Sequence, residues 1–261
     1  MPKNCVIFAP PGYEGEKFYQ PVENDWHVLH IELKRQLEEA GYEVIVYPCD
    51  VDVKSDIGIY FEHQLLVPLT ERSLLVMIEP PVVRPRQYEV ITGLPYTRIF
   101  THVKSLCDNK RIFQSPVPVP SYTKDLSHIK RDKYLCAITG FVPHDWPAYN
   151  HPEALYAQRE WIYRAFGKQL DLYGHRWHLW EHINEVNYLG VVADKIAKLA
   201  EYKNAIVFEN WEGFASEKIY HCVMAGTRPI YRGNRELVMR LDEVTEVPWA
   251  ARIVKAIQEI A

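Results

Sequence analysis

The sequence contains no apolar run long enough to span a bilayer and no pattern of a secretory signal peptide. It begins Met-Pro-Lys-Asn and passes directly into a short apolar stretch, residues 5–9. Its five cysteines are odd in number and scattered, without Cys-x-x-Cys spacing, which argues against a disulfide framework or a structural zinc site. We therefore expect a cytoplasmic protein without a transmembrane segment, and peripheral contact with a membrane stays open.

Charge of one sign is not concentrated anywhere along the chain. The 30 basic and 34 acidic residues give a formal net charge of −4, and neither sign forms a long run. This balance argues against nucleic acid or an anionic membrane as the main partner. The motifs Gly-x-Ser-x-Gly, His-Glu-x-x-His, Gly-x-Gly-x-x-Gly and the P-loop are also missing. Their absence disfavours the hydrolase, nucleoside triphosphatase and dehydrogenase classes.

Metal-ligand patterns are equally sparse. His178 and His182 have the i, i+4 spacing of two ligands on one helix face, but they lie in a Trp-rich region without a clear third ligand. The spelling Asp-x-Asp occurs at Asp50 and Asp52, in the first half and without partners. We therefore predict no metal site and no essential cofactor.

The chain instead shows a regular alternation of strand and helix signals. Short apolar runs typical of buried strands occur at residues 5–9, 42–47, 57–61, 74–78, 99–101, 134–139, 170–173, 205–208 and 229–231. Helical spacing occurs at residues 26–40, 154–166, 193–200, 216–225 and 248–260. Such alternation predicts parallel strands joined by helical crossovers.

A proline-rich segment, PVPVP at residues 116–120, divides this alternation into two halves, because it cannot form a central strand or a helix interior. We predict an α/β protein with two Rossmann-like domains facing across a cleft, in a compact version. The expected boundaries are residues 1–125, residues 126–246 and a closing helix at residues 247–261. Ligands of such sheets bind at the carboxyl ends of the strands.

The most informative stretch is residues 201–233. The predicted strand 205–208 delivers Glu209 and Asn210 to its carboxyl end, and Ser216 is a good N-cap for a helix whose first turn holds Glu217 and Lys218. The N-H groups of a helix N-terminus attract anions, and a lysine there adds a mobile positive charge. A Ser-Glu-Lys triplet alone is ordinary helix chemistry, so the whole stretch carries the argument.

That stretch resembles the α-1,3-fucosyltransferase family, an inverting family with two Rossmann-like domains in the GT-B arrangement. The family's signature is matched in order by Tyr202-Lys203-Asn204, Phe208-Glu209-Asn210, Ser216-Glu217-Lys218, Ala225-Gly226-Thr227, Pro229 and Gly233. This chain departs from the family in three places: Asn204 replaces Phe, Ser216 replaces Thr, and Phe214 stands, in a shorter loop, where the family commonly has Tyr.

Two further residues are assigned by the same resemblance. The family binds the nucleotide phosphate with an arginine on a helix, for which Arg159 is the positional counterpart and Arg164 the alternative. The segment ending in Glu79-Pro80-Pro81 resembles the family's strand end with a glutamate, which makes Glu79 the expected general base. Glu62, which follows the predicted strand 57–61, is the alternative base.

The resemblance implies a transferase of glycan biosynthesis that moves L-fucose from GDP-fucose to a hydroxyl of a glycan or glycolipid, with inversion. Arg159 and Lys218 would stabilise the diphosphate, and Glu217 and Asn210 would hold ribose or sugar hydroxyls. The remaining members of the expected donor site are Glu209, Phe214 and Ser216. Two alternatives stay open: a different GDP- or UDP-linked sugar as the donor, and a non-catalytic nucleotide-sugar-binding protein.

Overall fold

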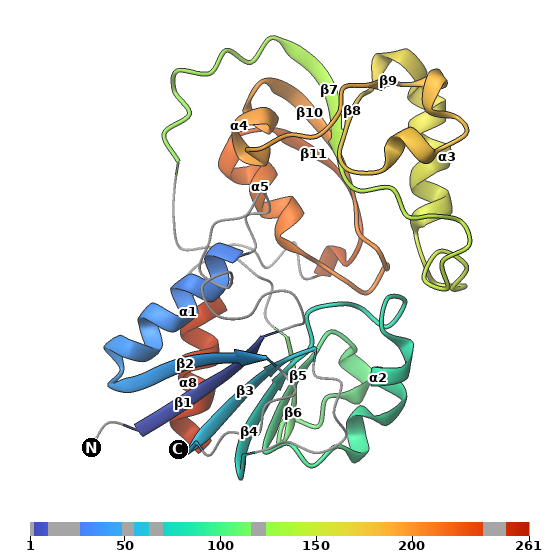
Figure 1. The fold of residues 1–261 in the computed structure, drawn as a ribbon. Helices are drawn as coiled ribbons and strands as arrows, with labels where there is room; N and C mark the ends of the chain where they lie inside the picture. Colours follow the sequence, from blue (N-terminus) through green and yellow to red (C-terminus); the bar gives the residue numbers. More distant parts are fainter. Residues whose placement is uncertain are drawn as a thin grey trace. The chain divides into compact units, whose positions relative to one another are not determined.

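The computed structural model of the chain describes residues 3–9, 27–48, 55–62, 70–115, 124–236 and 249–260. The chain divides into two compact units (Figure 1). Unit 1 combines Met1–Ser121 with Leu241–Ala261, and unit 2 is Tyr122–Arg240.

Unit 1 contains a parallel sheet of six strands in the order β2-β1-β3-β4-β5-β6. The strands are β1 (Lys3–Ala9), β2 (Tyr42–Pro48), β3 (Ile57–Phe61), β4 (Arg72–Val76), β5 (Arg98–Thr101) and β6 (Ile112–Gln114). Side chains from Cys5 to Ala9 are all buried, as expected for a parallel strand covered on both faces. Because all six strands run in one direction, the loops after them meet at one edge of the sheet.

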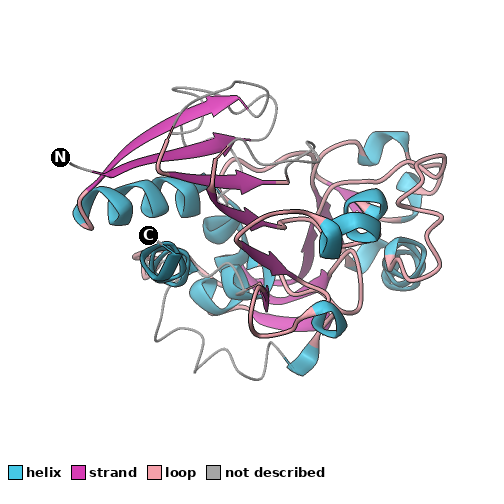
Figure 2. Ribbon diagram, turned by 90° about the horizontal axis from the view of Figure 1, so that it is seen from below, coloured by secondary structure: helices cyan, strands magenta, loops and turns pink. Residues whose placement is uncertain are grey.

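Helices cover both faces of this sheet. The helices α1 (His27–Glu39) and α8 (Trp249–Ile260) pack against each other on one face of the sheet (Figures 1 and 2). Leu33 and Leu37 of α1 and Ile253 and Ile257 of α8 are buried there. The other face packs against the segment that contains α2 (Pro85–Val90) and the 3-10 helix Ile91–Gly93. A second 3-10 helix, Lys104–Leu106, follows β5. The last helix of the chain is therefore part of the core that the first strands form.

Unit 2 contains a parallel sheet of five strands in the order β11-β10-β7-β8-β9. The strands are β7 (Lys133–Ile138), β8 (Asp171–Tyr173), β9 (Asn187–Tyr188), β10 (Tyr202–Phe208) and β11 (Arg228–Arg232). Counted from β7 in chain order, this arrangement reads 5-4-1-2-3, which is the first five strands of the Rossmann order. The strand order reverses between β7 and β10, and this is the point where such sheets bind their ligands.

The helix α3 (Tyr156–Phe166) packs on one face of this sheet, and α4 (Lys195–Ala200) and α5 (Glu217–Ala225) pack on the other. Three 3-10 helices lie between α3 and β9: Gly167–Gln169, Trp177–Leu179 and Ile183–Glu185. Gly226 ends α5 at φ +65, and its N-H donates to the carbonyls of Cys222 and Val223. The predicted glycine stop of this helix is confirmed.

Most predicted elements appear within two residues of their expected bounds, with one consequential error. The strand expected at residues 74–78 is β4, Arg72–Val76, so Glu79 does not directly end a strand and lies three residues beyond β4. Helix α2 and the short strand β9 were not predicted from the sequence. The proline-rich connector at residues 116–120 and the expected first residue of the helix at 248–260 lie outside the described residues. Within the described residues, no helix is long and apolar enough to cross a membrane.

Candidate functional site

The candidate site lies in unit 2 at the carboxyl ends of β7 and β10, where the strand order reverses. Thr139 and Gly140 follow β7, and Glu209 and Asn210 follow β10. The side chains of α3 and α5 reach this edge from opposite faces of the sheet. The predicted donor residues of the second half are therefore gathered at one sheet edge.

Glu209 is the buried centre of this edge, with an exposed fraction of 0%. Its Oε1 accepts the backbone N-H of Ser216 at 2.8 Å, and its Oε2 accepts the Ser216 hydroxyl at 2.8 Å. Nζ of Lys218 donates to the same Oε2 at 2.9 Å. The Glu209 carboxylate thus hydrogen-bonds within the protein, where it fixes the start of α5 and orients Lys218.

Gly233 makes room for this carboxylate. A Cβ atom at position 233 would lie 2.6 Å from Cγ of Glu209 and 2.4 Å from the hydroxyl of Tyr231. Burial first, and then the charge of Glu209, raise the pKa of the Tyr231 hydroxyl, which therefore stays protonated. The glycine that closes the predicted motif is thus a steric requirement for the position of Glu209.

Ser216 is the N-cap of α5, as predicted, and its hydroxyl accepts the N-H of Lys218 at 3.4 Å. Glu217 occupies the first turn beside Lys218, Lys195 and His221. Burial raises the pKa of Glu217, but these cationic neighbours outweigh it, so that the pKa is lowered overall. Glu217 is therefore a carboxylate at neutral pH and can accept hydrogen bonds from hydroxyl groups.

Lys218 keeps a solvent-facing part, with 25% of its side chain exposed. Burial lowers the pKa of its ammonium, but Glu209 and Glu217 outweigh that effect and raise the pKa above its usual value. An ammonium has three N-H donors, and Glu209 takes one of them. Lys218 is thus a charged ammonium that Glu209 holds in place, and its other N-H groups can donate to a ligand.

Arg159 is the second cation, and its burial is the unusual feature of the site. Only 2% of it is exposed, Nη2 donates to the Gly140 carbonyl at 3.1 Å, and the guanidinium lies over the rings of Tyr156 and Trp177. Its Nε is buried and has no hydrogen-bond partner among the described residues. No carboxylate within the described part of the chain forms an ion pair with it.

The two cations are close enough to influence each other. The charge of Arg159 lowers the pKa of Lys218, and both cations act on the buried hydroxyl of Tyr163. Glu209 and Glu217 lie beside Lys218 and balance its charge. Arg159 is therefore the one of the two cations whose charge no carboxylate among the described residues balances by an ion pair.

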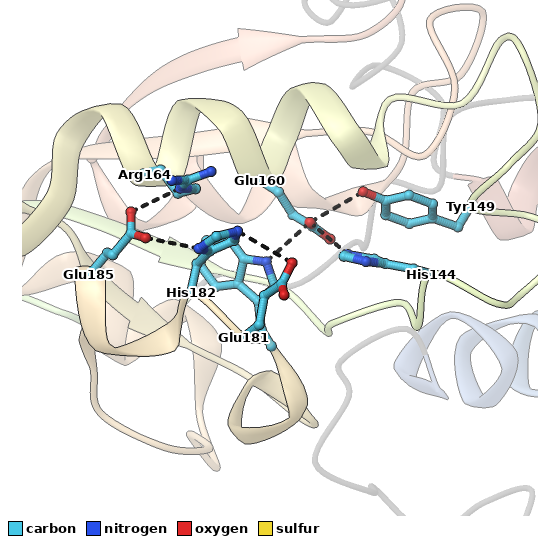
Figure 3. Close-up of polar contacts among 8 residues, drawn as sticks. His144, Tyr149, Glu160, Arg164, Glu181, His182 and Glu185 are labelled. Carbon is cyan, nitrogen blue, oxygen red and sulfur yellow. Dashed lines mark hydrogen bonds and ion pairs between the residues drawn. The ribbon is translucent and has the colours of Figure 1, made fainter.

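Arg164, the alternative to Arg159, points elsewhere (Figure 3). Its Nε donates to Oε2 of Glu185 at 2.8 Å on the exposed side of α3, and Oε1 of the same carboxylate pairs with Nδ1 of His182 at 2.8 Å. Arg164 thus already has a counter-ion, whereas Arg159 has none in the part of the chain that the structure describes.

A network of hydrogen bonds surrounds Glu160, the residue after Arg159, and was not anticipated from the sequence. Oε2 of Glu160 contacts Nε2 of His144 at 2.9 Å and the hydroxyl of Tyr149 at 3.2 Å (Figure 3). It also accepts a hydrogen bond from Nε1 of Trp180 at 3.1 Å. These contacts tie the loop after β7 to α3, one residue from Arg159. These partners lie 11 to 20 residues from Glu160 in the sequence, so no local sequence pattern could have predicted the contacts.

The loops after β7 and β8 also fit closely together. Gly174 has φ +131, and a Cβ atom there would lie 1.8 Å from the carbonyl oxygen of Thr139, so only glycine fits. The same carbonyl accepts Nε1 of Trp177 at 2.6 Å, which places that indole under Arg159.

Two predicted donor residues have other roles that the structure makes visible. Phe214 is buried, and its carbonyl accepts the N-H of Asn234 at 3.0 Å and the hydroxyl of Tyr231 at 3.3 Å. The Asn210 carbonyl accepts the N-H of Leu155 at 3.1 Å, which joins the end of β10 to the start of α3. Both residues help to shape the site edge through their backbones.

Glu79, the predicted base, belongs to unit 1 and lies at the edge formed by the carboxyl ends of that sheet. Its N-H donates to Oε1 of Glu62 at 2.6 Å, and its carbonyl accepts the hydroxyl of Tyr88 at 2.9 Å. The side chain is half-buried. Glu79 and Glu62, the two candidate bases, are therefore neighbours and not independent alternatives.

In the parts of the chain that the structure describes, no group of three or more His, Cys, Asp or Glu side chains is arranged so that it could hold a metal ion. His182 instead contacts Glu185 and Glu181. The Asp50 and Asp52 pair lies outside the described residues.

Comparisons with known proteins support the fold. No family model and no curated protein sequence matches the chain. A solved structure of an α1,3-fucosyltransferase matches with a TM-score of 0.52 and 14% identity, over 99% of this chain and 81% of that one. An α1,3-fucosyltransferase with GDP matches at 0.51 and 13% identity, over 94% and 77%.

An α-glucosyltransferase in complex with UDP and a 13-mer DNA also matches, at a TM-score of 0.51 and 13% identity, over 88% of this chain and 79% of that one. At such identities the likeness concerns the fold. The chain has the fold of GT-B glycosyltransferase structures, with two α/β units that each contain a parallel sheet. The predicted fold class is confirmed, whereas membership of the fucosyltransferase family stays a prediction.

Proposed function

We propose that the protein is an inverting glycosyltransferase whose unit 2 binds a nucleoside diphosphate sugar, with GDP-fucose as the donor. One observation carries the proposal: among the described residues, the buried Arg159 has no carboxylate partner. It lies beside Lys218, at the point where the strand order of a Rossmann-type sheet reverses. A buried cation is costly unless it is paired. A diphosphate supplies the missing negative charge, and the N-terminus of α5 adds N-H donors aimed at an anion.

The residues divide into contacting and positioning roles in this proposal. Arg159 and Lys218 contact the diphosphate, and Glu217 accepts hydrogen bonds from ribose or sugar hydroxyls. Glu209 is wholly buried, so we assign it and Ser216 to positioning Lys218 and the start of α5. Asn210 and Phe214 complete the edge.

The proposed reaction is a single displacement. The acceptor hydroxyl attacks C1 of the donor sugar, and the bond between C1 and the diphosphate oxygen breaks. The hydroxyl proton passes to the carboxylate of Glu79, and the nucleoside diphosphate leaves with the bonding electron pair, stabilised by the two cations.

GDP-fucose is proposed because of the motif at residues 201–233, and UDP-glucose is the alternative to test because a structurally similar α-glucosyltransferase was solved in complex with UDP. Calorimetric titration with GDP, UDP and the two sugar nucleotides separates these donors. Turnover of the tighter donor with a panel of glycan acceptors separates an enzyme from a binding protein. Binding of neither nucleotide would contradict the proposal.

The pair Arg159→Gln and Arg164→Gln tests the site with a control from the same helix. A charge-assisted contact contributes roughly 1.5–3 kcal/mol, so Arg159→Gln should weaken binding of the nucleoside diphosphate about 10- to 100-fold. Arg164→Gln removes an exposed ion pair and should leave binding within about twofold. Equal effects of the two substitutions would remove Arg159 from the site.

A further inference from the structure

Glu62 has an unusual backbone and an unusual environment. It directly follows β3, has φ +50, and is only 7% exposed. Its N-H donates to the Val76 carbonyl at the end of β4, at 3.3 Å. A residue other than glycine persists in the left-handed region only where its surroundings hold it there, and such residues cluster at functional sites.

Its carboxyl group holds the backbone that carries Glu79. Oε1 of Glu62 accepts the N-H of Ile78 and, at 2.6 Å, the N-H of Glu79. From the other side, the hydroxyl of Tyr88 donates to the Glu79 carbonyl at 2.9 Å. Both peptide groups of Glu79 are thus fixed, which restricts where its side chain can point.

The second carboxyl oxygen of Glu62, Oε2, does not share the hydrogen bonds of Oε1. Oε2 is buried and has no hydrogen-bond partner among the described residues, and Nε of Arg84 lies 4.0 Å away. The titratable and charged groups around Glu62 are Glu79 after β4, Arg84 and Tyr88 at α2, and His102 after β5. Burial, and to a smaller extent the charge of Glu79, raise the pKa of Glu62 to about 8 against the lowering effect of the two N-H groups and Arg84.

We propose that Glu62 is a positioning residue for Glu79: it fixes the peptide groups on which Glu79 is carried, and its own ionisation tunes the Glu79 carboxylate. This inference rests on the proposed function in so far as Glu79 acts as the base. With Oε1 occupied by two N-H donors, the proton of a neutral Glu62 sits on Oε2. Below its pKa, Glu62 therefore adds no negative charge beside Glu79, and above it a second carboxylate appears there.

Three variants separate the parts of this proposal. Glu62→Ala removes both the oxygen that accepts the N-H groups and the titrating proton. Glu62→Gln keeps an oxygen for the N-H groups and removes only the titration. Glu89→Gln, an exposed carboxylate on α2, is the matched control.

The first measurement needs no enzyme activity. We expect the side-chain carboxyl ¹³C signal of Glu79, assigned with Glu79→Gln, to show an inflection near pH 8 in the wild type and in Glu89→Gln, and none in Glu62→Gln. Amide exchange at Ile78 and Glu79 should accelerate at least tenfold in Glu62→Ala and stay near the wild-type rate in Glu62→Gln. A Glu79 signal without that inflection, or unchanged exchange in Glu62→Ala, would overturn the proposal.

The second measurement is release of nucleoside diphosphate from GDP-fucose and UDP-glucose, with glycan or water as the acceptor. A general base contributes about 10²–10⁴-fold in rate, so Glu62→Ala should lower kcat at least tenfold with KM for the donor within about twofold. Glu62→Gln should recover kcat below pH 8 and lose the inflection of the pH profile near pH 8. If the wild-type protein releases nucleotide from neither donor, the proposed function fails, and the ¹³C and exchange data still decide the role of Glu62.

Discussion

Nζ of Lys218 lies 2.9 Å from Oε2 of Glu209, a carboxylate that solvent does not reach. Lys218→Ala would leave this charge buried with only hydroxyl and backbone donors. We expect the free energy of unfolding of unit 2 to fall by about 2–3 kcal/mol, as measured by chemical denaturation. Weaker binding of a nucleoside diphosphate to this variant would then have two causes, the lost contact to phosphate and the lower stability of unit 2.

Removing the charges of Glu209 and Lys218 together separates the effect on binding from the effect on stability. The double variant Glu209→Gln/Lys218→Met should recover much of the stability, because no unpaired charge remains, while nucleoside diphosphate binding stays weak. Lys203→Ala, at an exposed lysine of the same unit, should change stability by less than about 0.5 kcal/mol. Equal destabilisation of the single and double variants would argue against a stabilising ion pair.

Gly233 is expected to be irreplaceable for the same site. Gly233→Ala places a Cβ 2.6 Å from Cγ of Glu209, so Glu209 or β11 must shift. We expect a loss of about 1–3 kcal/mol in unfolding free energy, accompanied by weaker nucleoside diphosphate binding. Gly93→Ala is the control, because a Cβ there would meet nothing within 4 Å. Wild-type affinity in Gly233→Ala would show that Glu209 can be displaced without cost to the site.

The acid-base behaviour of unit 1 gives a prediction with a defined sign. Glu62 has a pKa of about 8 in the folded protein and an ordinary value of 4.5, so the folded state holds a proton that the unfolded state has lost between these values. Stability from this group is therefore full below pH 4.5 and is lost as the pH rises through 8. His102 acts in the opposite sense, because burial lowers its pKa from 6.5 to about 4.

The two effects oppose each other below pH 6.5, which leaves Glu62 dominant between pH 6.5 and 8. Over that interval we expect the unfolding free energy of unit 1 to fall by about 1.4 kcal/mol per pH unit. Glu62→Gln should flatten this slope, and His102→Gln should retain it. Denaturation curves across the interval test both, and a flat wild-type profile would mean that Glu62 titrates normally.

The core position of the last helix can be tested by truncating one side chain. Ile257 of α8 is fully buried against the first sheet, so Ile257→Ala should destabilise unit 1 by about 2–5 kcal/mol. Gln258→Ala, at the exposed neighbouring position, should have little effect. Separate spectroscopic probes in the two units are the measurement, and we expect the unfolding of unit 2 to be unchanged.

The sequence predicted those features of the site that depend on neighbours in the chain. Ser216 could be recognised as an N-cap, and Glu209 could be placed at the end of a strand, because both follow from local patterns. Local patterns could not show that Glu209 turns inward to Ser216 and Lys218, since that depends on the space left by Gly233. The buried state of Arg159 likewise depends on the fold around it.

In unit 1, too, local sequence patterns could not predict a feature that depends on a distant residue. Its strands were predicted from apolar runs, but β4 ends at Val76, two residues before the end of its apolar run. Met77 still donates its N-H to the Phe100 carbonyl of β5 at 3.0 Å, whereas the N-H of the next residue, Ile78, donates to the Glu62 carboxyl. Hydrophobicity therefore could not mark the end of the strand, because the apolar run continues to a residue whose N-H bonds to a buried carboxyl 16 residues away.

Unit 1 is built from both ends of the chain, whereas unit 2 is continuous. During synthesis, all of unit 2 leaves the ribosome before the residues of α8 do. The apolar face formed by α1 and the first strands must wait for Ile253 and Ile257, the side chains that cover it. Until then the nascent chain exposes this face, so a chaperone that binds apolar segments would meet unit 1 incomplete and unit 2 already complete.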